Sequence, residues 1–358
     1  MPTSIKVHAQ ANEQALPREI STDAAYQTFA DSLYALMQPA PGMLKANPKG
    51  LHGVIVAQHG SVVFENYYGG MTPTTCFETY SVGKTLVALA AGLAYDEGKL
   101  DLSARVVDFF SDKVPAGLPD SMAALTVRQL LTMTAGFEEN ERLMSVFNPK
   151  AEGKESIDWA KEYFENYSHR PGTCFYYNLF GTYMMCDILY QLTHEDLVDY
   201  IMPRMLEPMH ITRSDWEHSP KGICAGGWGA KLCAEDMAKV GQLMLQQGKW
   251  DGKQLVSEEW MKMMTSKLVD SAPNIIMTKT NPAMAKPYPG EMHSEGYGFF
   301  VWRGPRNSYR AEGVGGQFVI VLPDYDAVLV LACNTTLTND IFDKVVWPYL
   351  LPVLEKSL

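Results

Sequence analysis

The stretch from Thr85 to Tyr95 is apolar on nearly every side of a helix, and a helix of this kind is buried on all faces. It follows Ser81 and Lys84 directly and ends near Gly98, a residue typical of helix C-termini. A chain that surrounds one helix completely needs further layers of helix or sheet around it. The same feature places Lys84 at the entrance of a buried helix and not on an exposed surface.

The spacing of Ser81 and Lys84 puts both side chains on one face of the helix start. A serine becomes a nucleophile when an adjacent base takes its proton, and a lysine can be that base when burial lowers its pKa. The helix start also offers backbone N–H groups to an oxyanion. The alternative is a capping serine followed by a surface lysine, which the buried helix disfavours.

Composition excludes several classes of function. The 358 residues carry a net charge of −11 with no visible basic patch, so we expect no nucleic-acid partner. No apolar run is long enough to span a bilayer, so we expect no membrane partner. The first ten residues lack the apolar segment of a secretion signal, which favours a cytoplasmic location, with a removed leader as the alternative.

The cysteines indicate neither a metal site nor a redox motif. They form no C-x-x-C pair and have no histidine at zinc spacing, so we expect no metal and no cofactor. Their scattered, apolar contexts are typical of reduced core thiols, although Cys224 and Cys233 could pair. The six residues are Cys76, Cys174, Cys186, Cys224, Cys233 and Cys333.

Strand patterns occur near both chain ends, with helical patterns between them. We expect a first helix over 23–38, a β-hairpin of 53–57 with 61–65, strands at 299–302, 318–322 and 327–331, and a last helix over 340–354 that is kinked or broken at Pro348. Thr126 and Gln129 fit a capping box whose helix would stop at Gly136. A further helical stripe runs from Met237 to Met244.

This order predicts an α+β fold, in which strands from both chain ends form one antiparallel sheet and a helical region is inserted between them. We expect an N-terminal arm over 1–20, a sheet region over 21–76 and 241–358, and a mainly helical region over 77–240. The active site would then lie at the seam between the two regions.

Several segments resemble the serine beta-lactamase-related family, and its class C branch in particular. The similar segments are 80–84, 96–102, 125–137, 226–228, 250–253, 297–302 and 313–318, so the resemblance covers roughly residues 50 to 345. It implies the beta-lactamase/transpeptidase-like architecture, with helices flanking the antiparallel sheet.

The resemblance also implies a Y-x-N motif at Tyr176-Tyr177-Asn178. In this family the tyrosine lies beside the serine and lysine and relays the proton, and the asparagine helps to hold the acyl chain. Tyr176 fits the first motif position, so it is preferred to Tyr177. A lysine ammonium nearby would stabilise the phenolate, although most of the 18 tyrosines are expected to serve packing.

The third family motif departs from the pattern of its relatives. They carry K-T-G or H-T-G on a strand beside the site, where this chain has Ala311-Glu312-Gly313. The resemblance implies that Gly313 and Gly315 allow a close approach to substrate, and that the N–H of Val314 joins that of Ser81 in an oxyanion hole. The alternative for the glycines is a simple hairpin turn. The missing cation disfavours a carboxylate-bearing substrate unless Arg310 replaces it.

The sequence therefore predicts a carboxylesterase-like serine hydrolase that forms an acyl-enzyme on a small-molecule ester or amide. Its catalytic residues would be Ser81, Lys84 and Tyr176, with Val314, Asn178, Gly313 and Gly315 binding substrate. Alternatives are a beta-lactamase, a D-amino-acid peptidase or an acyltransferase with the same chemistry, or a non-catalytic binding protein on the same fold.

Overall fold

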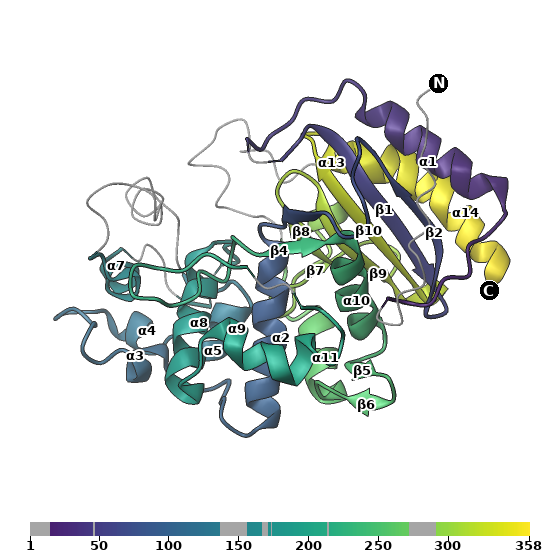
Figure 1. Ribbon diagram of the computed structural model, residues 1–358. Helices are drawn as coiled ribbons and strands as arrows, with labels where there is room; N and C mark the ends of the chain where they lie inside the picture. Colours follow the sequence, from purple (N-terminus) through teal and green to yellow (C-terminus); the bar gives the residue numbers. More distant parts are fainter. Residues whose placement is uncertain are drawn as a thin grey trace.

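A computed structural model describes residues 15–45, 47–136, 156–166, 171–172, 174–212, 215–271 and 291–358. An antiparallel sheet of six strands has the order β2-β1-β10-β9-β8-β7 (Figure 1). Its strands are β1 (Gly50–Gln58), β2 (Ser61–Tyr67), β7 (Trp302–Arg303), β8 (Tyr309–Gly313), β9 (Gln317–Leu322) and β10 (Ala327–Asn334). Two-stranded ribbons join β3 (Cys76–Glu78) to β4 (Lys231–Cys233) and β5 (Lys249–Trp250) to β6 (Lys253–Gln254).

Both ends of the chain contribute to the sheet. β1 pairs with β10 in antiparallel register, with Val54 opposite Leu331. Every residue of β1, β9 and β10 is buried, because helices cover both faces of the sheet. Strands buried on both faces have nearly continuous apolar sequences, which is why the sequence reveals them clearly. The α+β class and the sheet built from both chain ends are confirmed.

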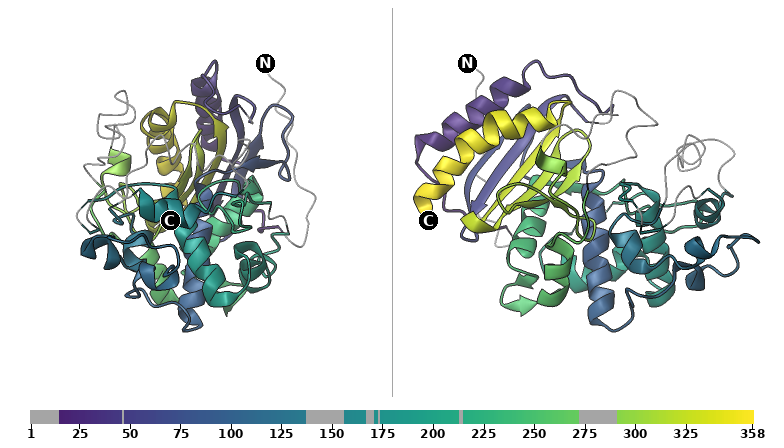
Figure 2. Two further views of the ribbon diagram at one scale, coloured as in Figure 1. Left: turned by 90° about the vertical axis from the view of Figure 1, so that its left-hand side faces the viewer. Right: turned by 180° about the vertical axis from the view of Figure 1, so that it is seen from behind.

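Helices form one layer on each face of the sheet (Figures 1 and 2). α1 (Ala24–Met37) and the C-terminal helices pack on one face, where Phe29 and Leu33 join an apolar cluster with Leu331. α10 (Ala234–Leu245) packs on the other face, against β9 and β10. The C-terminal helices are α13 (Thr338–Ile341), a π-helical segment (Phe342–Leu350) that contains Pro348, and α14 (Leu351–Leu354).

The helical region surrounds α2 (Val82–Asp96), which is buried from Val82 to Ala94. Gly92 allows Trp260 to pack directly on this helix, because a Cβ there would lie 2.5 Å from the indole Cδ1. The other helices are α3 (Val106–Phe109), α4 (Asp120–Ala123), α5 (Val127–Leu131), α7 (Trp159–Glu165), α8 (Phe180–Thr193), α9 (Leu197–Ile201) and α11 (Glu258–Thr265). Short π- or 3₁₀-helical segments are Met202–Leu206, Glu291–His293, Pro323–Tyr325 and Glu355–Ser357.

Two local predictions are wrong. The capping box of Thr126 and Gln129 is present, but α5 ends at Leu131 and not at Gly136, because Met133 has a positive φ of 57°. The expected strand over 299–302 pairs only at Trp302 and Arg303. Before it, Phe300 also has a positive φ and donates its N–H to the carbonyl of Leu131 instead of to a neighbouring strand.

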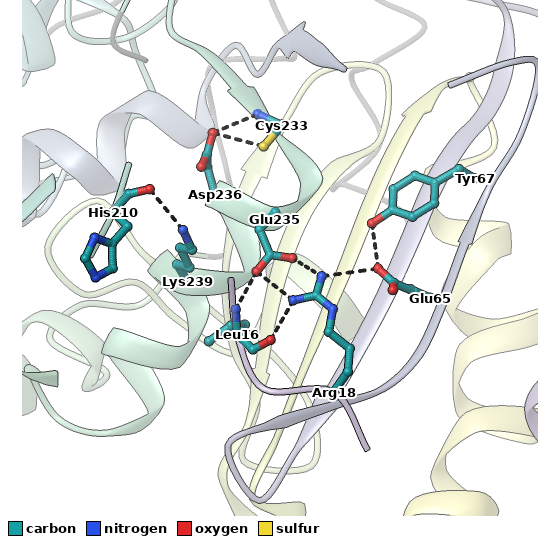
Figure 3. Close-up of polar contacts among 9 residues, drawn as sticks. All are labelled: Leu16, Arg18, Glu65, Tyr67, His210, Cys233, Glu235, Asp236 and Lys239. Atoms are coloured by element: carbon teal, nitrogen blue, oxygen red, sulfur yellow. Dashed lines mark hydrogen bonds and ion pairs between the residues drawn. The ribbon is translucent and has the colours of Figure 1, made fainter. Parts of the chain in front are cut away.

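The expected N-terminal arm covers residues 1–20, of which residues 1–14 lie outside the described part of the chain. Residues 15–20 run beside β2. The guanidinium of Arg18 contacts Glu65 on β2 at 3.3 Å and also Glu235 at the start of α10 (Figure 3). This segment therefore connects the sheet to α10. The expected boundary near residue 240 falls inside α10, so we propose that the sheet region resumes before this helix.

Candidate active site

Ser81 lies at the start of α2, immediately after the β3–β4 ribbon. Thr79 fixes this turn, because its N–H and its hydroxyl both donate to the carbonyl of Ala230, at 2.8 and 3.0 Å. Tyr80 has a positive φ of 49°, which is unfavourable for a bulky residue and is typical of functional sites. The hydroxyl of Ser81 makes no capping contact with the helix and is available for other chemistry.

Lys84 points to the hydroxyl of Ser81. Its Nζ donates to Ser81 Oγ at 2.9 Å and to the carbonyl of Gly227 at 3.1 Å. The side chain is only 1% exposed, so the amine reaches the serine inside the protein. Gly227 leaves room for it, since a Cβ at this position would lie 3.3 Å from Nζ.

The tyrosine ring beside Lys84 is that of Tyr177. Its centre lies 4.9 Å from Lys84 Nζ, and the ring stacks on Trp302 at 5.3 Å between centres. Tyr176 is completely buried, and its N–H donates to the carbonyl of Met133 at 2.6 Å. Our candidate for the proton relay therefore moves by one position, from Tyr176 to Tyr177.

Asn178 has a different environment from the one the motif implies. Its Oδ1 accepts the N–H of Gly181 at 2.7 Å, a contact of the helix-capping kind at the start of α8. Its Nδ2 donates to the carbonyl of Tyr176, also at 2.7 Å. The side chain is 1% exposed, and these two contacts shape the turn that presents Tyr177.

The end of β8 lies against the backbone of the nucleophile turn. A Cβ on Gly313 would lie 2.2 Å from the carbonyl oxygen of Thr79, so only glycine fits there. Val314 follows and is 43% exposed. Among the described residues, the N–H groups of Ser81 and Val314 have no hydrogen-bond acceptor, as an oxyanion hole requires. Gly315, with a φ of +85°, forms the turn that packs on Leu44.

Glu312, next to Gly313, belongs to a buried charge cluster. Arg310 Nη2 lies 2.7 Å and His293 Nε2 2.9 Å from Glu312 Oε2. Burial alone would raise the pKa of Glu312, but attraction to these two groups lowers its pKa to about 2. Arg310 is 1% exposed and also donates to the carbonyl of Met292, so it is not directed toward substrate. It therefore does not replace the missing cation at Ala311.

One aromatic residue connects this charge cluster to the site. Trp302 contacts His293 edge-on at 4.6 Å between ring centres, and its ring also stacks on Tyr177. This contact could not be predicted from the sequence, because Trp302 lies far along the chain from Tyr177, in a two-residue strand. Within the described ranges, no group of three or more histidine, cysteine or acidic residues could hold a metal ion.

A comparison with protein families shows to which family the chain belongs. A family model named Beta-lactamase matches residues 33–346. The chain belongs to the beta-lactamase family. The match extends from α1 to the C-terminal helices, so it includes both the sheet and the helical region. A search of curated proteins found no match.

Solved structures share the fold at low sequence identity. An octameric penicillin-binding protein homologue from Pyrococcus abyssi has a TM-score of 0.66 at 18% identity, with 95% of this chain and 79% of that chain covered. EstCE1, a hydrolase with promiscuous acyltransferase activity, has a TM-score of 0.64 at 19% identity, with 93% and 99% covered. SurE with D-Leu has a TM-score of 0.66 at 20% identity, with 93% and 75% covered.

None of the helices in the described ranges is long and apolar enough to cross a membrane.

Proposed function

We propose that this protein is a serine hydrolase that cleaves neutral esters or small amides through an acyl-enzyme. The observation that carries the proposal is the 2.9 Å contact from the buried amine of Lys84 to the hydroxyl of Ser81. An amine in that position can take the serine proton when the hydroxyl attacks a carbonyl. Membership of the beta-lactamase family supports the same chemistry.

We assign one or more residues to each step of the proposed reaction. Ser81 Oγ attacks the carbonyl carbon while Lys84 and Tyr177 accept its proton. The N–H groups of Ser81 and Val314 stabilise the negative oxygen of the tetrahedral intermediate. The proton then passes to the leaving alcohol or amine, and Ser81 remains acylated. Water next attacks the acyl carbon, the same base accepts the proton of the water, and Ser81 leaves as a free hydroxyl.

The preference for a neutral substrate follows from the charges near Gly313. Ala311 is buried and neutral, and Arg310 is already paired with Glu312. A carboxylate-bearing beta-lactam would lack a charge-assisted contact, typically worth about 1.5–3 kcal/mol. EstCE1 is a hydrolase with promiscuous acyltransferase activity, which supports an acyl-enzyme in this fold, and acyl transfer to an added alcohol is an outcome to test.

A fluorophosphonate probe tests the nucleophile directly. The wild type should be labelled, Ser81→Ala should not be, and peptide mapping should place the label on Ser81. A panel of short acyl esters, nitrocefin and D-alanyl peptides then tests the substrate class, with kcat/KM highest for a neutral ester. Absence of labelling would favour the non-catalytic binding protein, and a preference for nitrocefin would contradict the charge argument.

A further inference from the structure

Cys76 and Cys233 lie opposite each other in the ribbon that precedes the nucleophile. They are directly paired residues in the antiparallel register of β3 and β4. All six cysteines carry thiols in this structure. Cys224, the partner that sequence spacing suggested for Cys233, instead contacts the thiol of Cys186.

The hydrogen-bond pattern shows which kind of pair they form. Thr79 donates its N–H to Ala230, which makes these two a hydrogen-bonded pair. Hydrogen-bonded and non-hydrogen-bonded pairs alternate along an antiparallel ribbon, so three residues earlier Cys76 and Cys233 form a non-hydrogen-bonded pair. The Cα atoms of such a pair lie about 4.5 Å apart, within the range of about 4.4–6.8 Å for disulfides. Directly opposed side chains also project from the same face.

The two thiols differ in environment. Cys233 is buried, and its Sγ donates to Asp236 Oδ2 at 3.0 Å (Figure 3). Burial and then the charge of Asp236 raise the pKa of the Cys233 thiol. Cys76 is only partly buried. An oxidant in solution therefore reaches Cys76 first, and Cys233 is placed to resolve the product.

We propose that Cys76 and Cys233 form a disulfide bond in the presence of a low-molecular-weight disulfide such as oxidised glutathione, and that this bond stabilises the nucleophile turn. The thiolate of Cys76 attacks one sulfur of oxidised glutathione and releases one glutathione. Cys233 then attacks the Cys76 sulfur, and its proton passes to the second glutathione, which leaves as a thiol. Two protein thiols are oxidised, and one glutathione disulfide is reduced to two thiols.

The expected consequence is stability without a change in turnover. β3 continues through Thr79 and Tyr80 into Ser81, so the bond holds the strand that carries the nucleophile. A bond that closes so long a loop strongly restricts the unfolded chain, and the melting temperature should rise by several degrees. Because the register needs no backbone movement, the rate of ester hydrolysis should stay the same.

The experiment uses the full chain, incubated with oxidised glutathione or with dithiothreitol. We expect non-reducing peptide mapping to show a Cys76–Cys233 bond only after oxidation, together with a higher melting temperature. Cys76→Ser and Cys233→Ser should both lose the bond and the shift. In the second variant the serine hydroxyl keeps a donor for Asp236. Cys224→Ser changes the buried contact with Cys186 and should keep both the Cys76–Cys233 bond and the higher melting temperature.

Two results would overturn the proposal: no bond under oxidation, or a bond that maps to Cys186 and Cys224. A Cys76–Cys233 bond without a rise in melting temperature would contradict its stabilising role. Peptide mapping and melting do not depend on turnover, so these results are separate from any failure of the proposed hydrolase function.

Discussion

At the scale of single residues, Tyr177 lies next to Lys84, the lysine that we propose as the base. It lies between Lys84 and Trp302, and Trp302 in turn contacts His293. A stacked indole restricts the rotation of the phenol ring. We propose that Tyr177, held in this way, relays the proton between Ser81 and a leaving group.

The tyrosine pair offers a matched test. Tyr177→Phe should lower kcat for an ester by about 10²–10⁴, the usual contribution of general acid–base catalysis. Tyr176→Phe, one position earlier and completely buried, should leave kcat near the wild-type value. The measurement is kcat and its pH profile for the two variants. The reverse pattern would mean that the first position of the Y-x-N motif carries the function after all.

A substitution of Lys84 tests whether this residue acts as a base or contributes only its positive charge. Lys84→Arg should lose nearly as much kcat/KM as Lys84→Ala, because arginine stays protonated in proteins and cannot accept the serine proton. The close contact with Gly227 also leaves little room for a guanidinium. Fluorophosphonate labelling and ester hydrolysis measure the effect. Near-normal rates in the arginine variant would show that Lys84 contributes only its charge.

The sequence predicts the serine and lysine better than the tyrosine. Ser81 and Lys84 are defined by helical spacing and by the buried helix that follows. The choice between Tyr176 and Tyr177 depends on which side chain the turn presents, and Asn178 determines that turn through its contact with Gly181. The Y-x-N motif selects Tyr176 by spacing alone and contains no information on this contact.

At the scale of elements, β8 and the start of α2 position each other. Gly313→Ala should displace the end of β8, because the new Cβ would lie 2.2 Å from the Thr79 carbonyl oxygen. The N–H of Val314 would then move, and losing one oxyanion donor costs about 10²–10³ in kcat. We expect such a loss in ester hydrolysis with a smaller effect on KM.

Gly70→Ala is the control for this substitution. Gly70 has a positive φ of 80°, and a Cβ there would meet no atom within 4 Å. The Gly70 variant therefore measures the effect of adding a methyl group where no neighbouring atom has to move, and we expect wild-type kcat. If Gly313→Ala also kept its kcat, the end of β8 would not belong to the oxyanion hole.

Residue patterns alone did not predict β8, and only the family resemblance placed Ala311-Glu312-Gly313 on a strand. Arg310 and Glu312 alternate with Tyr309 and Ala311, but the alternation covers only five residues and is weaker than the continuous apolar runs of the other strands. Arg310 and Glu312 are buried only because they pair with each other and with His293. The apolar strands β1, β9 and β10 were visible by contrast, because each is buried on both faces.

At the scale of the whole molecule, the sequence predicts that both chain ends form one antiparallel sheet, because strand patterns occur at both ends, but it does not predict the order of the strands. The internal charge cluster cannot be predicted from the sequence, since its members come from segments around 293 and 310 that only the fold brings together.

The contribution of this charge cluster to stability should depend on pH. The pKa of Glu312 is depressed from 4.5 to about 2, so its stabilising effect is present above pH 4.5 and is lost as the pH falls toward 2.

Glu312→Gln tests this contribution against an exposed control, Glu258→Gln, whose carboxylate pairs with Lys262 on the surface of α11. Removing one partner of a buried ion pair costs about 3–5 kcal/mol, because the charge of Arg310 stays buried without its anion. The melting temperature of Glu312→Gln should therefore lie well below that of the wild type at pH 6 to 7 and approach it as the pH falls from 4.5 to 2. Glu258→Gln should stay close to the wild type throughout. A gap for Glu312→Gln that stayed constant down to pH 2 would mean that lost packing, and not the charge of Glu312, causes the difference.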